Sequence, residues 1–155
     1  PLPPHLDGPG HNQPLTHSRV LPSCGRRFHE AKIKGEPKTV VWGSGNPRRE
    51  FLYVDDLATA SIHIMNLKKD VYRMSTDLMC SHINVGSGED IKIKDLAEII
   101  KNVVDYRGFI IYDKNKPDGV PQKLLDSSLI NSLGWSSKVN LKDGISKAYN
   151  DFKTA

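Results

Sequence analysis

Two adjacent pairs of arginines are the residues of this chain best suited to bind a ligand. Arg26 and Arg27 form the first pair, and Arg48 and Arg49 form the second. A guanidinium group is planar, keeps its charge and can donate two parallel hydrogen bonds to phosphate oxygens. The first fifty residues hold eight basic and four acidic residues, and the remainder hold fourteen of each, so the net charge of +4 arises in the first third. We therefore expect this region to bind a small phosphorylated ligand.

Other polar groups favour simpler roles. The pair Gly86-Ser-Gly88 follows an apolar run, but the third glycine of a Gly-x-Gly-x-x-Gly fingerprint would fall at Ile91, so a turn is expected instead. Asp55 and Asp56 are predicted to cap a helix. The six histidines and two cysteines show no metal-ligand spacing, so no metal site is predicted and the cysteines are interpreted as free structural thiols.

Composition restricts the classes of partner. No basic helix with interleaved aromatic residues and no zinc-finger, RNP or KH signature is present in the sequence, which argues against nucleic acid. The absence of an apolar run of about 18 residues and of a basic-then-apolar leader argues against a membrane span and a signal peptide. The expected compartment is the cytoplasm. Because the sequence begins with Pro1, we expect either a processed start or missing upstream sequence.

Helices and strands are predicted to alternate along the chain, which indicates an α/β fold. Residues 1–19 contain five prolines and no apolar period, so an extended or irregular lead-in is expected, and residues 68–81 are interpreted as a loop. Apolar spacing and turn residues predict helices over residues 20–34, 55–67, 93–104, 127–133 and 141–152, and strands over residues 39–42, 49–54, 82–85 and 109–112.

Several motifs, taken together, resemble one enzyme family. The segments are RRFHEA, VVWGSGNPRREFLYVDDLA, HINVGSGED, KPDG and LLD. They resemble the C-terminal half of the GDP-L-fucose synthases, which are NADP-dependent epimerase/reductases of the extended short-chain dehydrogenase family, and the resemblance runs from about Leu6 to Phe152. It implies a substrate-binding part of a Rossmann-type fold whose N-terminal nucleotide-binding half is missing. Residues 20–155 would be the substrate-binding domain, with the last Rossmann strand and helix at about residues 82–104.

The resemblance also implies a reaction and its contact residues. Such enzymes epimerise GDP-4-keto-6-deoxymannose at two carbons beside the ketone and reduce the ketone with hydride from NADPH. Matching positions assign the GDP-sugar contacts to Arg27, Trp42, Arg49 and Asp118, and the NADP contacts to Pro3 and Leu6. Two guanidinium groups suit a diphosphate, and an indole face suits a purine. A homodimer is also consistent with the family.

One departure from the family pattern concerns catalysis. Arg19 occupies the position of the family's proton-donating histidine, and arginine cannot give up a proton near neutral pH. The family's glycine-rich loop, catalytic serine and Tyr-x-x-x-Lys pair would lie upstream of Pro1. This chain alone is therefore predicted to be inactive. Two alternatives remain open: a non-catalytic nucleotide-sugar-binding or interaction remnant, and another nucleotide-sugar epimerase or dehydratase.

Overall fold

The computed structural model describes residues 5–7 and 20–154 of the chain, and helices alternate with strands as the sequence predicts. The helices are α1 (Val20–Lys34), α2 (Val54–Met65), α3 (Lys69–Ser75), α4 (Ile93–Val104), α5 (Ser128–Ser132) and α6 (Leu141–Thr154). The strands are β1 (His5–Asp7), β2 (Lys38–Trp42), β3 (Arg48–Tyr53), β4 (Asp90–Lys92), β5 (Phe109–Asp113) and β6 (Gln122–Lys123). The predicted α/β class is confirmed.

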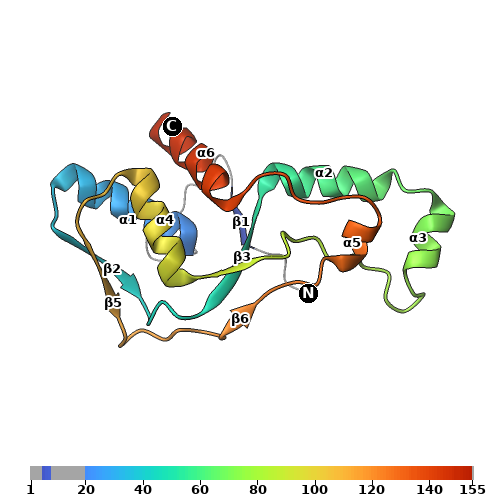
Figure 1. Cartoon of the computed structure of the whole chain (residues 1–155), viewed down its shortest axis with the longest axis horizontal. Coiled ribbons are helices and arrows are strands. Elements are labelled where there is room, and N and C mark those ends of the chain that lie inside the picture. The colour runs from blue at the N-terminus through green and yellow to red at the C-terminus, as the bar shows by residue number, and fades with distance from the viewer. Residues whose placement is uncertain (1–4, 8–19, 155) are drawn as a thin grey trace.

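The strands form two small sheets. In the first, β3 pairs in parallel with β1 and β6 and antiparallel with β4. In the second, β2 and β5 pair in parallel over their whole length, from Lys38 opposite Phe109 to Trp42 opposite Asp113. Because β2 leads directly to β3 through a short turn, that turn joins the two sheets (Figure 1).

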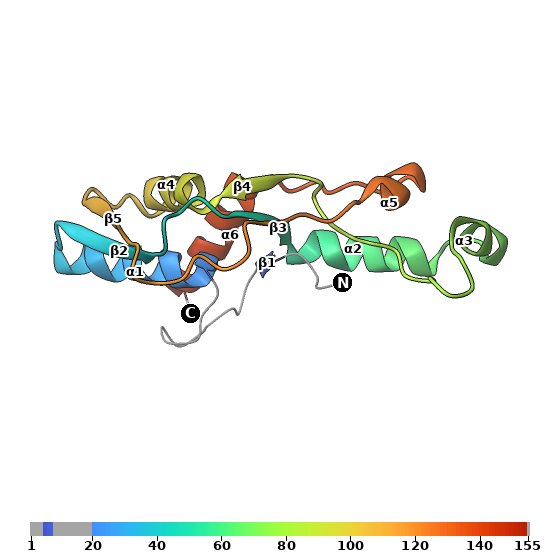
Figure 2. The same cartoon turned by 90° about the horizontal axis from the view of Figure 1, so that it is seen from below.

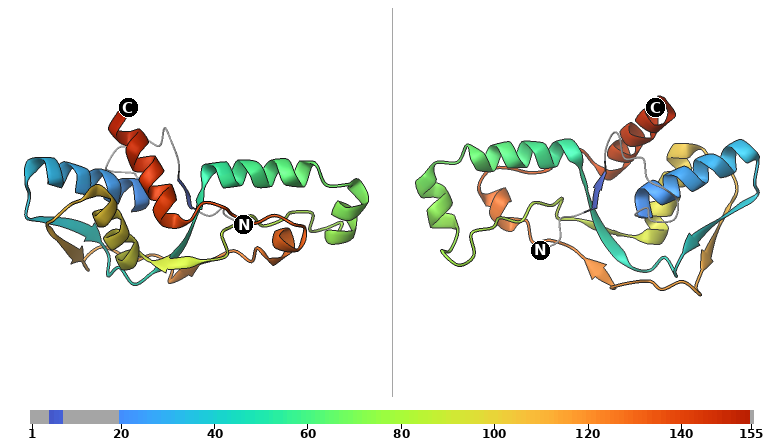
Figure 3. Two further views of the ribbon diagram at one scale, coloured as in Figure 1. Left: turned by 45° about the horizontal axis from the view of Figure 1, so that its top comes forward. Right: turned by 180° about the vertical axis from the view of Figure 1, so that it is seen from behind.

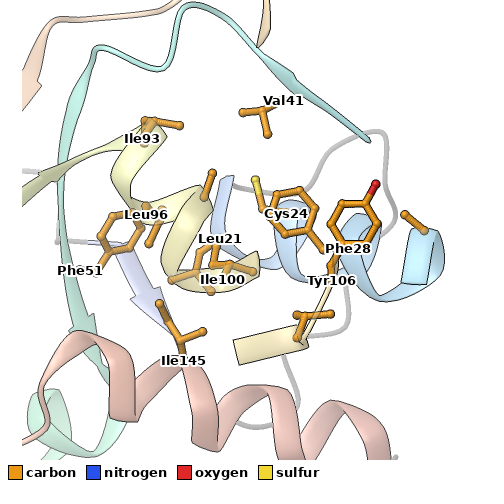
Figure 4. Close-up of a cluster of buried hydrophobic side chains, with 13 residues drawn as sticks. Leu21, Cys24, Phe28, Val41, Phe51, Ile93, Leu96, Ile100, Tyr106 and Ile145 are labelled. Carbon is orange, nitrogen blue, oxygen red and sulfur yellow. The ribbon is translucent and has the colours of Figure 1, made fainter. Parts of the chain in front are cut away.

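The larger apolar core lies where α1, α4 and α6 pack beside β2 and β5. The buried residues of α4 recur at helical spacing, which gives the helix one continuous apolar face. Phe28 of α1 is completely buried and its ring stacks on Tyr106 at 5.8 Å between centroids (Figure 4). The buried members of this core are Leu21, Cys24, Phe28, Ala31, Val41, Phe51, Ile93, Leu96, Ala97, Ile100, Val104, Tyr106 and Ile145.

A second, smaller core lies on the other side of β3, beside α2 and α5. Its buried residues are Leu52, Ala60, Ile130 and Trp135, and the Trp135 indole N–H donates to the Thr59 hydroxyl at 3.2 Å. The two cores give the molecule an elongated shape, with α1, α4 and α6 grouped on one side of β3 and α2, α3 and α5 on the other (Figures 2 and 3). None of the described helices is both long enough and apolar enough to cross a membrane.

Two buried carboxylates connect segments that are distant in sequence. Glu50 of β3 accepts hydrogen bonds from the backbone N–H of Gly88 at 2.8 Å and of Leu125 at 3.0 Å. Gly86 has no room for a side chain, because a Cβ there would lie 2.4 Å from the Glu50 carboxylate. The glycine pair therefore forms the predicted turn, and its backbone binds a carboxylate of the same chain.

Asp56 forms the second connection, and it corrects the predicted helix cap. Tyr53, and neither aspartate, precedes the first turn of α2, and no side chain caps it. Asp56 is 3% exposed and accepts hydrogen bonds from the backbone N–H groups of Lys138 and Val139, at 3.1 and 3.0 Å. The prediction was wrong because capping is a local pattern, whereas the partners of Asp56 lie more than 80 residues away.

Two further predictions of secondary structure were wrong, whereas residues 5–7 of the lead-in form the extended strand β1, within the segment expected to be extended or irregular. The interval 68–81 contains α3, which buries no residue and therefore has no apolar period in its sequence. Residues 82–85 form no strand in the described part of the chain; Ile83 and Val85 pack against the smaller core, and the strand β4 follows the turn instead.

Candidate functional site

Each arginine pair divides into one arginine that binds a carboxylate and one that does not. Arg26 forms an ion pair with Glu30 at 2.8 Å, and Arg48 forms one with Asp90 at 2.6 Å. The Arg48 hydrogen bond lowers the pKa of Asp90 below its ordinary value. Arg27 and Arg49 have no carboxylate partner among the described residues, and each donates to a main-chain carbonyl. Arg27 and Arg49 therefore retain donors and charge that a ligand could use.

Arg27 lies beside the exposed indole of Trp42. Its Nη1 donates to the Val40 carbonyl at 3.2 Å, which holds the side chain of α1 along β2. Its guanidinium carbon lies 5.0 Å from the centroid of the Trp42 ring. Trp42 is 53% exposed at the end of β2. A cation beside an accessible aromatic ring suits a ligand that carries both a planar base and an anion.

The segment between β5 and β6 runs beside the β2–β3 turn. The Gly43 N–H donates to the Asp113 carbonyl at 2.9 Å, and the Arg48 N–H donates to the Pro121 carbonyl at 2.8 Å. Between these two points, the Asp118 carboxylate accepts hydrogen bonds from the Ser44 N–H and hydroxyl, both at 2.6 Å. We call the Ser44–Asp118 contact the turn clasp.

The turn clasp explains the glycine at position 43. Gly43 has a φ of +85°, and a Cβ there would lie 2.4 Å from the Asp118 carboxylate. Glycine alone combines this backbone conformation with the close approach. The hydrogen bonds from the Ser44 side chain and backbone lower the pKa of Asp118, so the carboxylate is charged at neutral pH.

The segment that the turn clasp holds also reaches Trp42 and Arg49. The Lys116 ammonium lies 5.3 Å from the centroid of the Trp42 ring. Gly119 lies beside Arg49, since a Cβ at that glycine would be 3.4 Å from Arg49 Nη2. One loop thus carries Asp118 and lies beside Trp42 and Arg49, and Trp42 in turn lies beside Arg27. We call the set of Arg27, Trp42, Arg49, Lys116 and Asp118 the indole–arginine site.

Sequence reasoning missed two members of this arrangement. Lys116 and Ser44 were not predicted as site residues, although both lie within motifs that carried the family resemblance, KPDG and WGSG. Their roles depend on the contact between the two loops, which spacing along the chain does not show. Asp118 was predicted as a ligand contact; in the structure its carboxylate binds Ser44.

Three other predicted positions lie in the lead-in. Pro3 and Arg19 fall outside the described residues, and Leu6 lies in β1, opposite Leu52 in the pairing with β3. Within residues 5–7 and 20–154, no group of three or more histidines, cysteines, aspartates or glutamates could hold a metal ion. In the Gly86-Ser-Gly88 segment, the Gly88 N–H donates to the Glu50 carboxylate, so this backbone binds a side chain of the same chain.

Several known proteins are similar to this chain. Residues 2–86 match the model of the NAD dependent epimerase/dehydratase family. A GDP-L-fucose synthase of Escherichia coli is 48% identical over 151 residues, which is 97% of this chain and 47% of that protein. GDP-L-fucose synthase 1 of Arabidopsis thaliana is 46% identical over 96% of this chain and 43% of its own length. The chain spans about half the length of these relatives.

A solved structure agrees with the fold. A GDP-D-glycero-L-gluco-heptose synthase of Campylobacter jejuni, crystallised in the presence of NADPH, is 32% identical, with a TM-score of 0.85 over 96% of this chain and 51% of that chain. The resemblance predicted from the motifs is confirmed by these matches. The chain belongs to the NAD-dependent epimerase/dehydratase family.

Proposed function

We propose that this chain supplies the nucleotide-sugar-binding part of a GDP-L-fucose synthase-type enzyme. In the complete enzyme, GDP-4-keto-6-deoxymannose would be epimerised beside its ketone and reduced with hydride from NADPH. The relatives named GDP-L-fucose synthase support this substrate class. The family's glycine-rich NADP-binding loop would belong to the half of the relatives' length that this chain does not span.

The observation that most strongly supports the proposal is that the two arginines of each pair have different partners. Arg27 and Arg49 lack carboxylate partners in the described part of the chain, whereas Arg26 and Arg48 have them. Two uncompensated guanidinium groups can neutralise a diphosphate, and the exposed Trp42 ring can stack on a purine. In this proposal Arg27 and Arg49 bind phosphate, and Trp42 contacts the base. Asp118 keeps the loop in place and lies within reach of the ligand.

Calorimetric titration of the 155-residue chain with GDP and GMP tests the ligand class. We expect GDP to bind more tightly than GMP through its second phosphate, and we expect the affinity for GDP to fall as salt is added. Equal affinity for the two nucleotides, or affinity that salt does not change, would contradict a diphosphate site.

Arg49→Lys tests whether the guanidinium geometry matters. Lysine keeps the charge but loses the planar pair of donors, so we expect a loss of about 1–3 kcal/mol in GDP binding. Arg26→Lys is the matched control, because Arg26 binds Glu30 and lies outside the indole–arginine site. GDP affinity should fall in the first variant and stay unchanged in the second. An unchanged Arg49→Lys affinity would make Arg49 an ordinary surface residue.

Arg19 separates an enzyme from a non-catalytic binding remnant. If the family's N-terminal half is supplied in a longer chain or as a second chain, a proton donor at position 19 would still be missing. General acids and bases contribute about 10²–10⁴-fold, so Arg19→His should raise the rate of solvent deuterium exchange beside the ketone by that range. Rapid exchange with Arg19, unchanged in Arg19→His, would assign the proton transfer to another group.

The remaining predictions rest on the family resemblance. They are the NADP contacts of Pro3 and Leu6, the assignment of residues 82–104 to the last Rossmann unit, the cytoplasmic location and the homodimer. The alternative function is that of another nucleotide-sugar epimerase or dehydratase. Tighter binding of a different nucleoside diphosphate, such as UDP, than of GDP would favour this alternative.

A further inference from the structure

We propose that Lys116 is an additional ligand-binding residue, which lies beside the Trp42 ring in this structure and moves to the diphosphate when a base stacks there. This inference rests on the proposed function and adds a residue that the sequence motifs did not assign. It starts from the positively charged groups that lie beside the Trp42 ring. Trp42 has two cations beside its ring, Arg27 at 5.0 Å and Lys116 at 5.3 Å from the centroid.

A purine cannot stack on an indole face that a cation already covers. The base would therefore displace whichever cation covers the face on which it stacks. Arg27 is held by its hydrogen bond to the Val40 carbonyl. Among the described residues, the Lys116 ammonium has neither a hydrogen bond nor an ion pair, and its position rests on the ring alone. An exposed cation–π contact is worth only about 0.5–1 kcal/mol, so Lys116 is the group that moves.

The loop backbone limits this movement to the side chain. The Lys116 N–H donates to the Asp113 carbonyl at 3.1 Å, and two residues later the turn clasp fixes Asp118 to Ser44. The flexible lysine stem can swing while its Cα stays beside the site. Gly119 of the same loop lies beside Arg49, since a Cβ at that glycine would be 3.4 Å from Arg49 Nη2, so the loop that carries Lys116 also borders one of the guanidinium groups that would bind phosphate.

The test compares two charge-removing variants of the same loop. Lys116→Met keeps the long apolar stem and removes the charge, and Lys114→Met does the same at an exposed position two residues earlier. Calorimetry with GDP and with guanosine separates the contribution of phosphate from that of the base. We expect Lys116→Met to bind GDP about 3- to 10-fold more weakly, as befits one lost charge contact at a surface site. Lys114→Met should bind GDP as the wild type does.

The same variant should not weaken the binding of guanosine, which has no phosphate. Comparing the two ligands therefore distinguishes a lost phosphate contact from a distorted loop. Without a cation to displace, Lys116→Met should bind guanosine at least as tightly as the wild type. A parallel loss for guanosine and GDP would overturn the inference, because a distorted loop weakens both ligands. Unchanged GDP affinity in Lys116→Met would overturn it as well and leave the proposed function standing. Failure of the wild-type chain to bind GDP at all would overturn both.

Discussion

Glu50 shows how one buried side chain organises the centre of this molecule. Its two carboxylate oxygens accept hydrogen bonds from backbone N–H groups on opposite sides, those of Gly88 and Leu125. It is 2% exposed, so water does not replace a lost partner. A residue that sequence reasoning treats as an ordinary strand glutamate therefore holds β3, the 86–88 turn and the approach to α5 together.

Replacing Glu50 with glutamine should destabilise the fold. The amide group of Glu50→Gln turns one acceptor into a donor, so one of the two N–H groups, that of Gly88 or that of Leu125, loses its partner beside a buried side chain. We expect a loss of about 1–3 kcal/mol in the free energy of unfolding, seen as a lower midpoint in urea. Glu89→Gln, at an exposed position in the same turn, is the control and should unfold like the wild type. Equal midpoints for both variants would show that the carboxylate is dispensable.

The two cysteines should differ sharply in reactivity. Burial raises the pKa of the Cys24 thiol to about 12, whereas Cys80 is exposed. Alkylation requires the thiolate, so brief treatment of the native chain with iodoacetamide at pH 8 should modify Cys80 and leave Cys24 intact. Peptide mapping by mass spectrometry distinguishes the two, and both should react after unfolding. Comparable labelling of Cys24 in the native chain would contradict its burial in the larger core.

Among the elements, those with a regular apolar pattern could be predicted from the sequence. The helices α1, α4 and α6 bury one face each and the strand β2 alternates buried and exposed residues, and burial imposes the spacing that sequence reasoning detects. The helix α3 buries nothing, and β6 has only two residues, so neither leaves a pattern. Residues 82–85 have a strand-like composition, but a strand also needs a neighbour to bond to.

Most residues of the candidate site could be predicted from the sequence, but their partners could not. Arg27 and Arg49 could be singled out by residue type, and the family motifs added Trp42 and Asp118. Which arginine of each pair binds a carboxylate depends on Glu30 and Asp90, and Asp90 lies 42 residues from its partner. Spacing along the chain does not contain that information.

The turn clasp should be visible as a shifted titration. Hydrogen bonds from Ser44 lower the pKa of Asp118, so the clasp stabilises the fold above the ordinary pKa of aspartate and is lost as the pH falls through the depressed value. Ser44→Ala removes the hydroxyl donor and should raise the pKa of Asp118 toward about 3.9. Carboxyl titration by NMR measures this. Asp126, whose pKa is lowered by Ser128 instead, is the internal control, and an unmoved Asp118 would argue against the clasp.

At the scale of the whole molecule, stability should be unevenly distributed. The larger core has thirteen buried members and the smaller one has four. The end of the molecule that carries α3 exposes Met65, Met74, Leu78 and Met79 to solvent. Segments with few buried contacts open at low free-energy cost, so we expect local unfolding to begin there.

Limited trypsin digestion tests whether local unfolding begins at the end of the molecule that carries α3. Lys69 and Arg73 lie on α3, whereas Lys94 has an exposed side chain on α4, beside the larger core. Cleavage after Lys69 or Arg73 should precede cleavage after Lys94, because a protease needs a locally unfolded backbone. Mass spectrometry of the first fragments identifies the site. Initial cleavage after Lys94 would reverse the expected order of stability.

The large sequence separation between the two buried carboxylates and their hydrogen-bond partners also determines when this part of the fold can form during synthesis. Asp56 finds its partners 82 and 83 residues later in the chain, and Glu50 binds the Leu125 N–H 75 residues later. At about 5–20 residues per second, the ribosome needs roughly 4–16 s to add the last of these partners after Asp56 itself. During that interval both carboxylates stay hydrated and the smaller core stays open. Formation of this part of the fold is therefore tied to the synthesis of the segment from Leu125 to Val139, and chaperones can bind the unfinished part during that interval.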